Sequence, residues 1–207
     1  MMGFISEFIL PKEVDFNAAL QNQAHISKLM VQQLYKACIN DDPDALSAIS
    51  SGALQARKQK AKNMKQLLDV FITPYDKESI YRIITELDWV ALSVRHFQLE
   101  ARVYDTHSLQ EYRSIVNILM QMTIMLEAGI AQLSNRNVKP IATRIDLIHD
   151  LYNRVVGRCA TATGDLLIQN DIKRILRHKD MLQQLKEIAK RIHIAANTLE
   201  DMAIKVV

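Results

Sequence analysis

Apolar residues recur three and four positions apart along most of the chain, and this spacing constrains the fold more than any other feature. It is clearest between residues 80 and 97, where the stripe consists of Ile80, Ile83, Leu87, Val90, Val94 and Phe97. Such intervals place apolar side chains on one face of an α-helix. Only five glycines and four prolines occur in 207 residues, so the chain carries little of the turn chemistry that a sheet protein needs. The pattern therefore predicts a few long helices and no strand.

Short polar or proline-containing breaks divide the pattern into six segments. The predicted helices cover about residues 15–40, 43–70, 73–105, 108–133, 138–164 and 178–204, with a separate short piece at 171–177 before the last. We expect Pro43 in the first turn of the second helix, and Thr73 as the cap of the third, followed by Pro74. Alternating spacings of three and four residues are typical of helical bundles. The sequence therefore predicts an all-α protein, an elongated six-helix bundle.

Composition and charge argue against several classes of protein. The net charge of +3 is too small to indicate nucleic-acid binding, which requires a strongly basic face. The two cysteines, Cys38 and Cys159, lie in apolar helical patterns without metal-type spacing, so we expect small core residues in a reducing compartment. No signal peptide is evident, and no stretch is expected to span a bilayer. We therefore expect a cytoplasmic protein.

The chain contains no set of residues that suggests catalysis. It has no glycine-rich phosphate loop, no ordered Ser-His-Asp set and no cysteine in a nucleophile context. Di-iron enzymes of the helical-bundle class need two Glu-x-x-His motifs with further carboxylates, and only Asp146-x-x-His149 comes near that pattern. We therefore expect a binding protein and not an enzyme.

The segment Phe71–Ile80 reads Phe-Ile-Thr-Pro-Tyr-Asp-Lys-Glu-Ser-Ile. It resembles the Phe-Ile-Thr-Pro-(aromatic)-Asp-(Arg/Lys)-Glu-Asp-Ile signature of the PhoU-like family, and more narrowly the branch often encoded beside Pit-type phosphate transporters. The opening residues 8–12, the pair Leu87-Asp88 and the ending 199–205 are also similar to that branch. The resemblance covers essentially the whole chain.

This resemblance implies a single domain of two three-helix repeats, at about residues 12–105 and 107–207. It implies an accessory or regulatory role in inorganic phosphate transport, with a Pit-type phosphate permease or a phosphate-pathway regulator as the partner. A homo-oligomer is expected, and membrane association only through the partner. A helical scaffold or oligomer unrelated to phosphate is the alternative that the residues leave open.

PhoU-like proteins characteristically carry acidic (Glu/Asp)-x-x-x-Asp motifs that hold metal ions, and here the sequence departs from the resemblance. The first acidic pair is expected at Ala53 and Arg57, neither of which supplies an oxygen ligand. Asp88 is present, but Trp89 and Leu92 follow where acidic residues are expected. The resemblance therefore implies that much of this metal site is lost.

The last two helices show the same departure. One acidic pair survives as Asp146 and Asp150, with His149 between them, whereas Lys186 and Lys190 occupy the matching positions of the last helix. Residues four apart share one helix face. We therefore expect cations to stand where relatives hold metal, with Arg57 paired to Asp88, and with Lys186 and Lys190 paired to Asp146 and Asp150.

Two other interpretations of these charges stay open. They could be solvated side chains that never meet, or Asp146, His149 and Asp150 could form a remnant iron or zinc site. Apart from that remnant metal, no cofactor is expected.

The same positions define the face that we expect to bind the partner. It consists of Arg57, Asp88, Trp89, Lys186 and Lys190, together with Asp146 and Asp150. Direct phosphate sensing by Arg57, Lys186 and Lys190 ranks last, because no helix N-terminus supports it. The basic run at residues 57–65 fits a solvated face, an acidic partner or anionic lipid headgroups.

Overall fold

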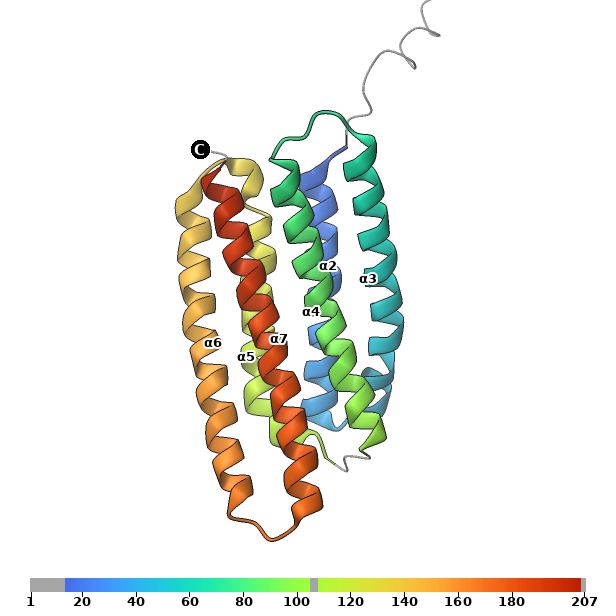
Figure 1. The fold of residues 1–207 in the computed structure, drawn as a ribbon, viewed down its shortest axis with the longest axis vertical. Coiled ribbons are helices and arrows are strands. Elements are labelled where there is room, and N and C mark those ends of the chain that lie inside the picture. Colours follow the sequence, from blue (N-terminus) through green and yellow to red (C-terminus); the bar gives the residue numbers. More distant parts are fainter. Residues whose placement is uncertain (1–13, 105–107, 206–207) are drawn as a thin grey trace, which may run out of the picture.

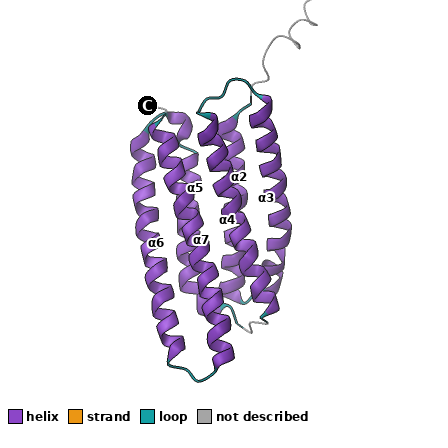
Figure 2. Cartoon of the chain, in the orientation of Figure 1, coloured by secondary structure: helices purple, strands orange, loops and turns teal. Residues whose placement is uncertain are grey.

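A computed structural model describes residues 14–104 and 108–205, which form six long helices (Figures 1 and 2). The elements are α2 Phe16–Asn40, α3 Pro43–Asp69, α4 Lys77–Val103, η1 Gln110–Tyr112, α5 Arg113–Ile130, η2 Leu133–Asn135, α6 Val138–Leu167 and α7 Ile172–Ile204. No strand occurs in these residues. The predicted all-α fold of six helices is confirmed.

The helices lie side by side along the long axis of an elongated bundle (Figure 1). α2, α3 and α4 pack against one another, and so do α5, α6 and α7. The two groups meet where α4 packs on α7 and where α2 packs on α5. α3, α4, α7 and α6 therefore follow one another across one broad face of the bundle. The repeat boundaries at 12–105 and 107–207 stay a prediction.

The apolar stripes face inward and form one continuous core. Leu87, Phe97 and Leu185 are completely buried within it. Cys38 and Cys159 are also buried and unbonded, which confirms them as core residues. Burial of these stripes is the main source of stability for helices of this length, because isolated helices are marginal in water.

Aspartate and asparagine side chains cap most of the helices, and Pro43 begins α3 as predicted. The predicted cap of α4 was wrong. Asp76, and not Thr73, accepts the backbone N–H of Ser79 at 3.0 Å, and the helix begins at Lys77. The Thr73 hydroxyl instead donates to the Tyr75 carbonyl at 2.7 Å, which stabilises the turn before the helix.

The division of the last helix into two pieces was also wrong. α7 runs without interruption from Ile172 to Ile204, because residues 171–177 contain no glycine or proline to stop it. Asp171 caps its start by accepting the backbone N–H of Arg174 at 3.0 Å. The preceding helix α6 extends to Leu167, a few residues beyond the prediction, so a short turn joins the two longest helices.

One segment does have the length and hydropathy of a membrane span, contrary to the sequence expectation. Residues Gln110–Asn135 reach a mean hydropathy of 1.5, and half of the most apolar window is buried inside the bundle. A core helix produces the same pattern, and α5 packs against α2, α6 and α7. The opening motif at residues 8–12 lies outside the described residues.

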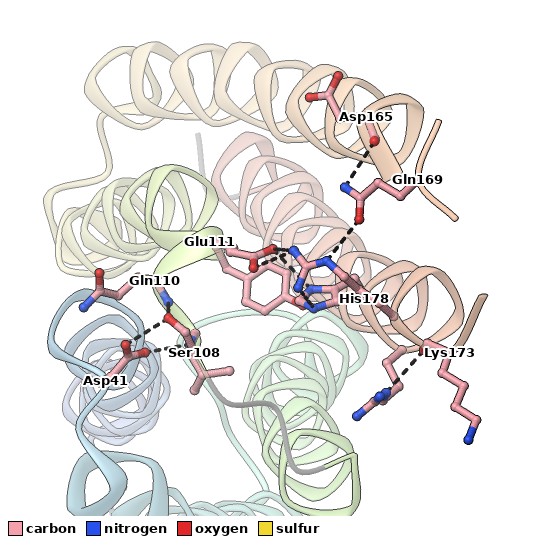
Figure 3. Close-up of polar contacts among 12 residues, drawn as sticks. Asp41, Ser108, Gln110, Glu111, Asp165, Gln169, Lys173 and His178 are labelled. Atoms are coloured by element: carbon pink, nitrogen blue, oxygen red, sulfur yellow. Dashed lines mark hydrogen bonds and ion pairs between the residues drawn. The ribbon is translucent and has the colours of Figure 1, made fainter. Parts of the chain in front are cut away.

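The turn between α2 and α3 is tied to the start of the second helical group. Asp41 ends α2 in the left-handed region, with φ of 50°. Its carboxylate accepts the Ser108 hydroxyl at 2.9 Å and the Leu109 backbone N–H at 2.6 Å, as Figure 3 shows for Ser108. This contact fixes one end of the bundle.

Candidate functional site

A groove of about 800 Å³ lies between α3 and α4 on the broad face of the bundle. We call it the α3–α4 groove, and its lining residues are Ala53, Leu54, Ala56, Arg57, Lys60, Ala61, Met64, Asp88, Ala91, Leu92 and Arg95. Alanines leave room between the two helices, while charged side chains line the same space. The groove thus brings together Ala53, Arg57 and Leu92, three of the positions at which the sequence departs from the acidic motifs, and the retained Asp88.

The predicted pairing of Arg57 with Asp88 was wrong. Lys60 Nζ lies 2.6 Å from Asp88 Oδ2 instead. Lys60 stands nearly one turn further along α3, and this places its ammonium level with Asp88 on the neighbouring helix. Arg57 is exposed and makes no ion pair within residues 14–104 and 108–205. Its guanidinium is therefore available to a ligand in the groove.

The third cation of the groove, Arg95, is held by a buried amide. Its guanidinium donates to Ser50 Oγ at 2.8 Å and to the side-chain oxygen of Gln98. Gln98 is completely buried and donates to the Leu46 carbonyl at 2.5 Å, which anchors it between α3 and α4. Because the guanidinium is oriented by these bonds, it presents a fixed positive charge at the edge of the groove.

The charges of the groove are unbalanced. Arg57, Lys60 and Arg95 face the single carboxylate of Asp88, which leaves an excess of two positive charges. A dication has little reason to bind in such surroundings, whereas an acidic side chain or another anionic group is attracted. The arrangement therefore suits the binding of an anionic group.

Trp89 does not reach the groove but lies on the seam between α4 and α7. The Arg191 guanidinium covers its ring at 4.6 Å from the ring centroid, a cation–π geometry. Arg191 also pairs with Glu187 at 2.6 Å.

Near Arg191, one carboxylate oxygen of Glu86 is buried without a hydrogen bond among the described residues. Burial raises the pKa of Glu86, while the positive charges of Arg191 and Arg82 act in the opposite direction.

Lys186 lies in a different hollow of about 690 Å³ between α6 and α7, which Cys159 also lines. Lys190 is exposed. The predicted pairs of these lysines with Asp146 and Asp150 were wrong, since none of those ion pairs forms in the described part of the chain.

The register of the antiparallel helices α6 and α7 explains the error for Lys186. Cys159 Sγ lies 3.6 Å from the Leu182 carbonyl, and His149 Nε2 lies 2.8 Å from Asn197 Oδ1. These two contacts place Lys186 well along α6 from the aspartate pair, which instead lies level with the last turns of α7.

His149 belongs to a small aromatic cluster. Its ring centroid lies 4.6 Å from that of His193, which stacks on Tyr152 at 4.7 Å. Burial and the neighbouring imidazole lower the pKa of His193. Among the residues that the structure describes, no three His, Cys, Asp or Glu side chains are placed to hold a metal ion, so Asp146, His149 and Asp150 do not converge into the remnant site.

Sequence patterns gave no sign of a polar cluster between η1 and α7 (Figure 3). Arg174 Nη2 lies within hydrogen-bonding distance of both carboxylate oxygens of Glu111, at 2.7 and 2.8 Å, and the Arg174 guanidinium also reaches His178 Nε2 at 3.1 Å. Since arginine only donates hydrogen bonds, that nitrogen accepts, and the proton of the neutral ring sits on Nδ1, 2.6 Å from the Tyr112 hydroxyl. Burial lowers the pKa of His178, in agreement with a neutral ring. Residues 111 and 174 are too far apart in sequence for local spacing to connect them.

Comparison with known proteins places the fold. No family model matches the chain. The UPF0111 protein YkaA of Bacillus subtilis (strain 168) is 24% identical over 148 residues, which cover 69% of this chain and 70% of that protein.

Two solved structures from Shewanella oneidensis MR-1 share the architecture. One is a PhoU-like protein with a TM-score of 0.77 at 13% identity, covering 92% of this chain and all of that one. The other, described as a PhoU-like phosphate regulatory protein, has a TM-score of 0.76 at 13% identity and covers 93% of this chain and all of that one. This chain therefore has the helical fold of PhoU-like proteins. The narrower resemblance to the Pit-associated branch stays a prediction.

Proposed function

We propose that this chain is a non-enzymatic regulatory protein of inorganic phosphate transport, which acts by binding a partner protein through the α3–α4 groove. The observation that carries the proposal is the PhoU-like fold, shared over 93% of the chain with a protein described as a phosphate regulator. The sequence resemblance to the Pit-associated branch supports the same role. The proposed partner is the cytoplasmic part of a Pit-type permease or a phosphate-pathway regulator.

The chemistry of the groove suits a protein partner of a particular kind. Leu54 and Leu92 are exposed at its edge, next to the unpaired guanidinium of Arg57. An amphipathic helix that carries acidic and apolar residues would match both features, since its apolar face can lie in the groove while its carboxylates meet the cations. Where relatives would hold a metal ion, this chain would then hold the acidic groups of its partner.

The proposal has a direct test in a strain that lacks the gene. Uptake of radioactive phosphate is measured after complementation with the wild type, with Arg57→Glu and with Lys62→Glu. Both variants make the same charge change on exposed positions of α3, but residue 62 lies outside the groove. We expect the wild type and Lys62→Glu to restore normal control of uptake, and Arg57→Glu to fail.

Two outcomes would count against the proposal. Unchanged phosphate uptake in the deletion strain would favour a helical scaffold without a role in phosphate transport. Equal complementation by both variants would keep the phosphate role but remove the groove from it. Circular dichroism of the purified variants checks that each retains the helical fold.

A further inference from the structure

The hollow of about 690 Å³ between α6 and α7 occupies the same place in its pair of helices as the α3–α4 groove does in the other pair. We call this hollow the α6–α7 groove. The lining positions of α3 recur in α6 at one constant interval: residues 53, 56, 57, 60, 61 and 64 correspond to residues 156, 159, 160, 163, 164 and 167. Those of α4 recur in α7 in the same way: residues 88, 91, 92 and 95 correspond to residues 179, 182, 183 and 186.

The packing beneath the two grooves is also equivalent. Ala56 and Ala91 are buried at the floor of the α3–α4 groove, and their counterparts Cys159 and Leu182 are buried in the α6–α7 groove. Cys159 Sγ lies 3.6 Å from the Leu182 carbonyl, so these counterparts meet between the two helices. α2 packs against both α3 and α4, and α5 packs against both α6 and α7. Each groove therefore opens on the side away from one supporting helix.

Both grooves open on the same broad face. In Figure 1, α6, α7, α4 and α3 follow one another across the front of the molecule, with α5 and α2 behind them. The α3–α4 loop and the α6–α7 turn lie at opposite ends of the long axis. The two helix pairs therefore run in opposite directions on either side of the seam between α4 and α7, and a two-fold rotation about an axis through this seam relates one groove to the other.

The α6–α7 groove also carries an excess of positive charge. Its charged lining residues are Lys179, Lys186 and Asp180, which leaves an excess of one positive charge, compared with two in the α3–α4 groove. The Asp180 carboxylate accepts the Tyr104 hydroxyl of α4 at 3.1 Å, so it lies on the wall nearest the seam. Neither lysine forms an ion pair within residues 14–104 and 108–205. An acidic side chain is therefore attracted to this groove as it is to the other.

Apolar side chains accompany these charges in both grooves and on the seam between them. Val156 and Leu167 are exposed at the edge of the α6–α7 groove, as Leu54 and Leu92 are in the α3–α4 groove. On the seam, Trp89 is 38% exposed beneath the Arg191 guanidinium. Tryptophan and arginine are enriched among the residues that contribute most to protein–protein binding. A partner that entered both grooves would cross this seam and cover Trp89.

From this arrangement we infer that the α6–α7 groove is a second docking site for the same partner, which places one acidic amphipathic helix in each groove. The inference rests on the proposed function of the α3–α4 groove. The two helices of the partner would be related by the same two-fold rotation as the grooves. Linking two contacts in one complex raises the overall affinity, because the second contact forms at a high effective concentration.

The test is photocrosslinking in the cells that produce this chain. A photoreactive amino acid replaces Val156 in one strain, Leu54 in a second and Arg158 in a third. Arg158 is exposed on α6 but does not line the groove, so it is the matched control. We expect positions 54 and 156 to trap the same protein, identified by mass spectrometry, and position 158 to trap none.

The protein identified in this way is then titrated against variants of the full chain. Lys186→Glu and, separately, Lys179→Glu should each weaken its binding at least about tenfold, because each damages one of two linked contacts. Arg158→Glu makes the same change of charge on α6 outside the groove and should leave binding unchanged. Circular dichroism checks that each variant retains the helical fold.

The outcomes separate this inference from the proposed function. A phosphate permease or regulator trapped from position 54 but not from 156 would leave the proposed function intact and overturn the second site. Different proteins from the two positions, or unchanged binding by both lysine variants, would also overturn it. One protein trapped from both grooves, with no role in phosphate transport, would support the second site and contradict the proposed function. No product from either position would contradict both.

Discussion

The packing of α2 against α3, which sets the position of one wall of the α3–α4 groove, depends on a glycine. A Cβ added at Gly52 would lie 2.9 Å from Met30 Cγ and 3.6 Å from its Sδ. Met30 is only 1% exposed and its Cγ lies close to its own backbone, so it can move away only by displacing the buried side chains around it. Gly157, also within a helix, has no atom within 4 Å of the same added carbon. An alanine at either position changes helix propensity equally, but only an alanine at Gly52 crowds a neighbouring side chain.

The expected free energies follow from these distances. Replacing a glycine in a helix by alanine favours the helix by about 1 kcal/mol, and this gain applies at both positions. Overpacking at Gly52 costs about 1–3 kcal/mol. Gly157→Ala should therefore stabilise the protein by about 1 kcal/mol, while Gly52→Ala should be neutral or destabilised by up to about 2 kcal/mol.

The difference between the two variants should be about 1–3 kcal/mol, or roughly 2–12 °C in Tm for a chain of this size. Thermal and urea unfolding, followed by circular dichroism, measure it. If Gly52→Ala proves as stable as Gly157→Ala, then α2 and α3 do not approach as closely as the structure shows, and the described shape of the groove is wrong.

Three further predictions concern thiols, pH and metal. Burial raises the pKa of Cys159 to about 11 and that of Cys38 higher still, so a thiol reagent at neutral pH should label neither cysteine in the folded protein and both after denaturation; rapid labelling of the native chain would contradict their burial. Because burial lowers the pKa of His178 below its ordinary value of 6.5, the unfolded chain binds a proton that the folded chain does not. The stability that His178 contributes is fully present above pH 6.5, the ordinary pKa of histidine, and is lost as the pH falls toward the lower pKa of the folded protein. His178→Gln should therefore reduce the decrease of Tm between about pH 7.5 and 5. The same decrease in the variant and the wild type would refute the claim that His178 is neutral in the folded protein. Elemental analysis of the untagged protein should find no stoichiometric iron, zinc or manganese, whereas one or more ions per chain would show that metal ligands had been overlooked.

Helix positions and core residues could be predicted from sequence because both depend on local spacing. The stripe from Ile80 to Phe97 determines which side of α4 is buried, whatever helix packs against it. Local spacing did not determine the start of α4, since Thr73 and Asp76 are both capping residues. The choice between them depends on the turn that precedes the helix.

Contacts between helices could not be predicted in the same way. Periodicity shows which face a charge occupies but not how far the neighbouring helix has slid along it. Lys60, one turn from the expected Arg57, therefore takes Asp88, and Lys186 lies beside Cys159 instead of the aspartate pair. The cluster of Glu111, Arg174 and His178 was missed for a related reason, because its members come from elements distant in sequence.

The central claim is that the α3–α4 groove binds a protein of phosphate transport, and photocrosslinking in the cells that produce this chain tests it most directly. A photoreactive amino acid replaces the exposed Leu54 in the groove, and a second strain carries it at Lys62 on the same helix but outside the groove. Crosslinked products are identified by mass spectrometry. The account predicts a product with a phosphate permease or a phosphate-pathway regulator from position 54 alone, and its loss when Arg57→Glu is added. No such product, or one that persists with Arg57→Glu, would contradict it.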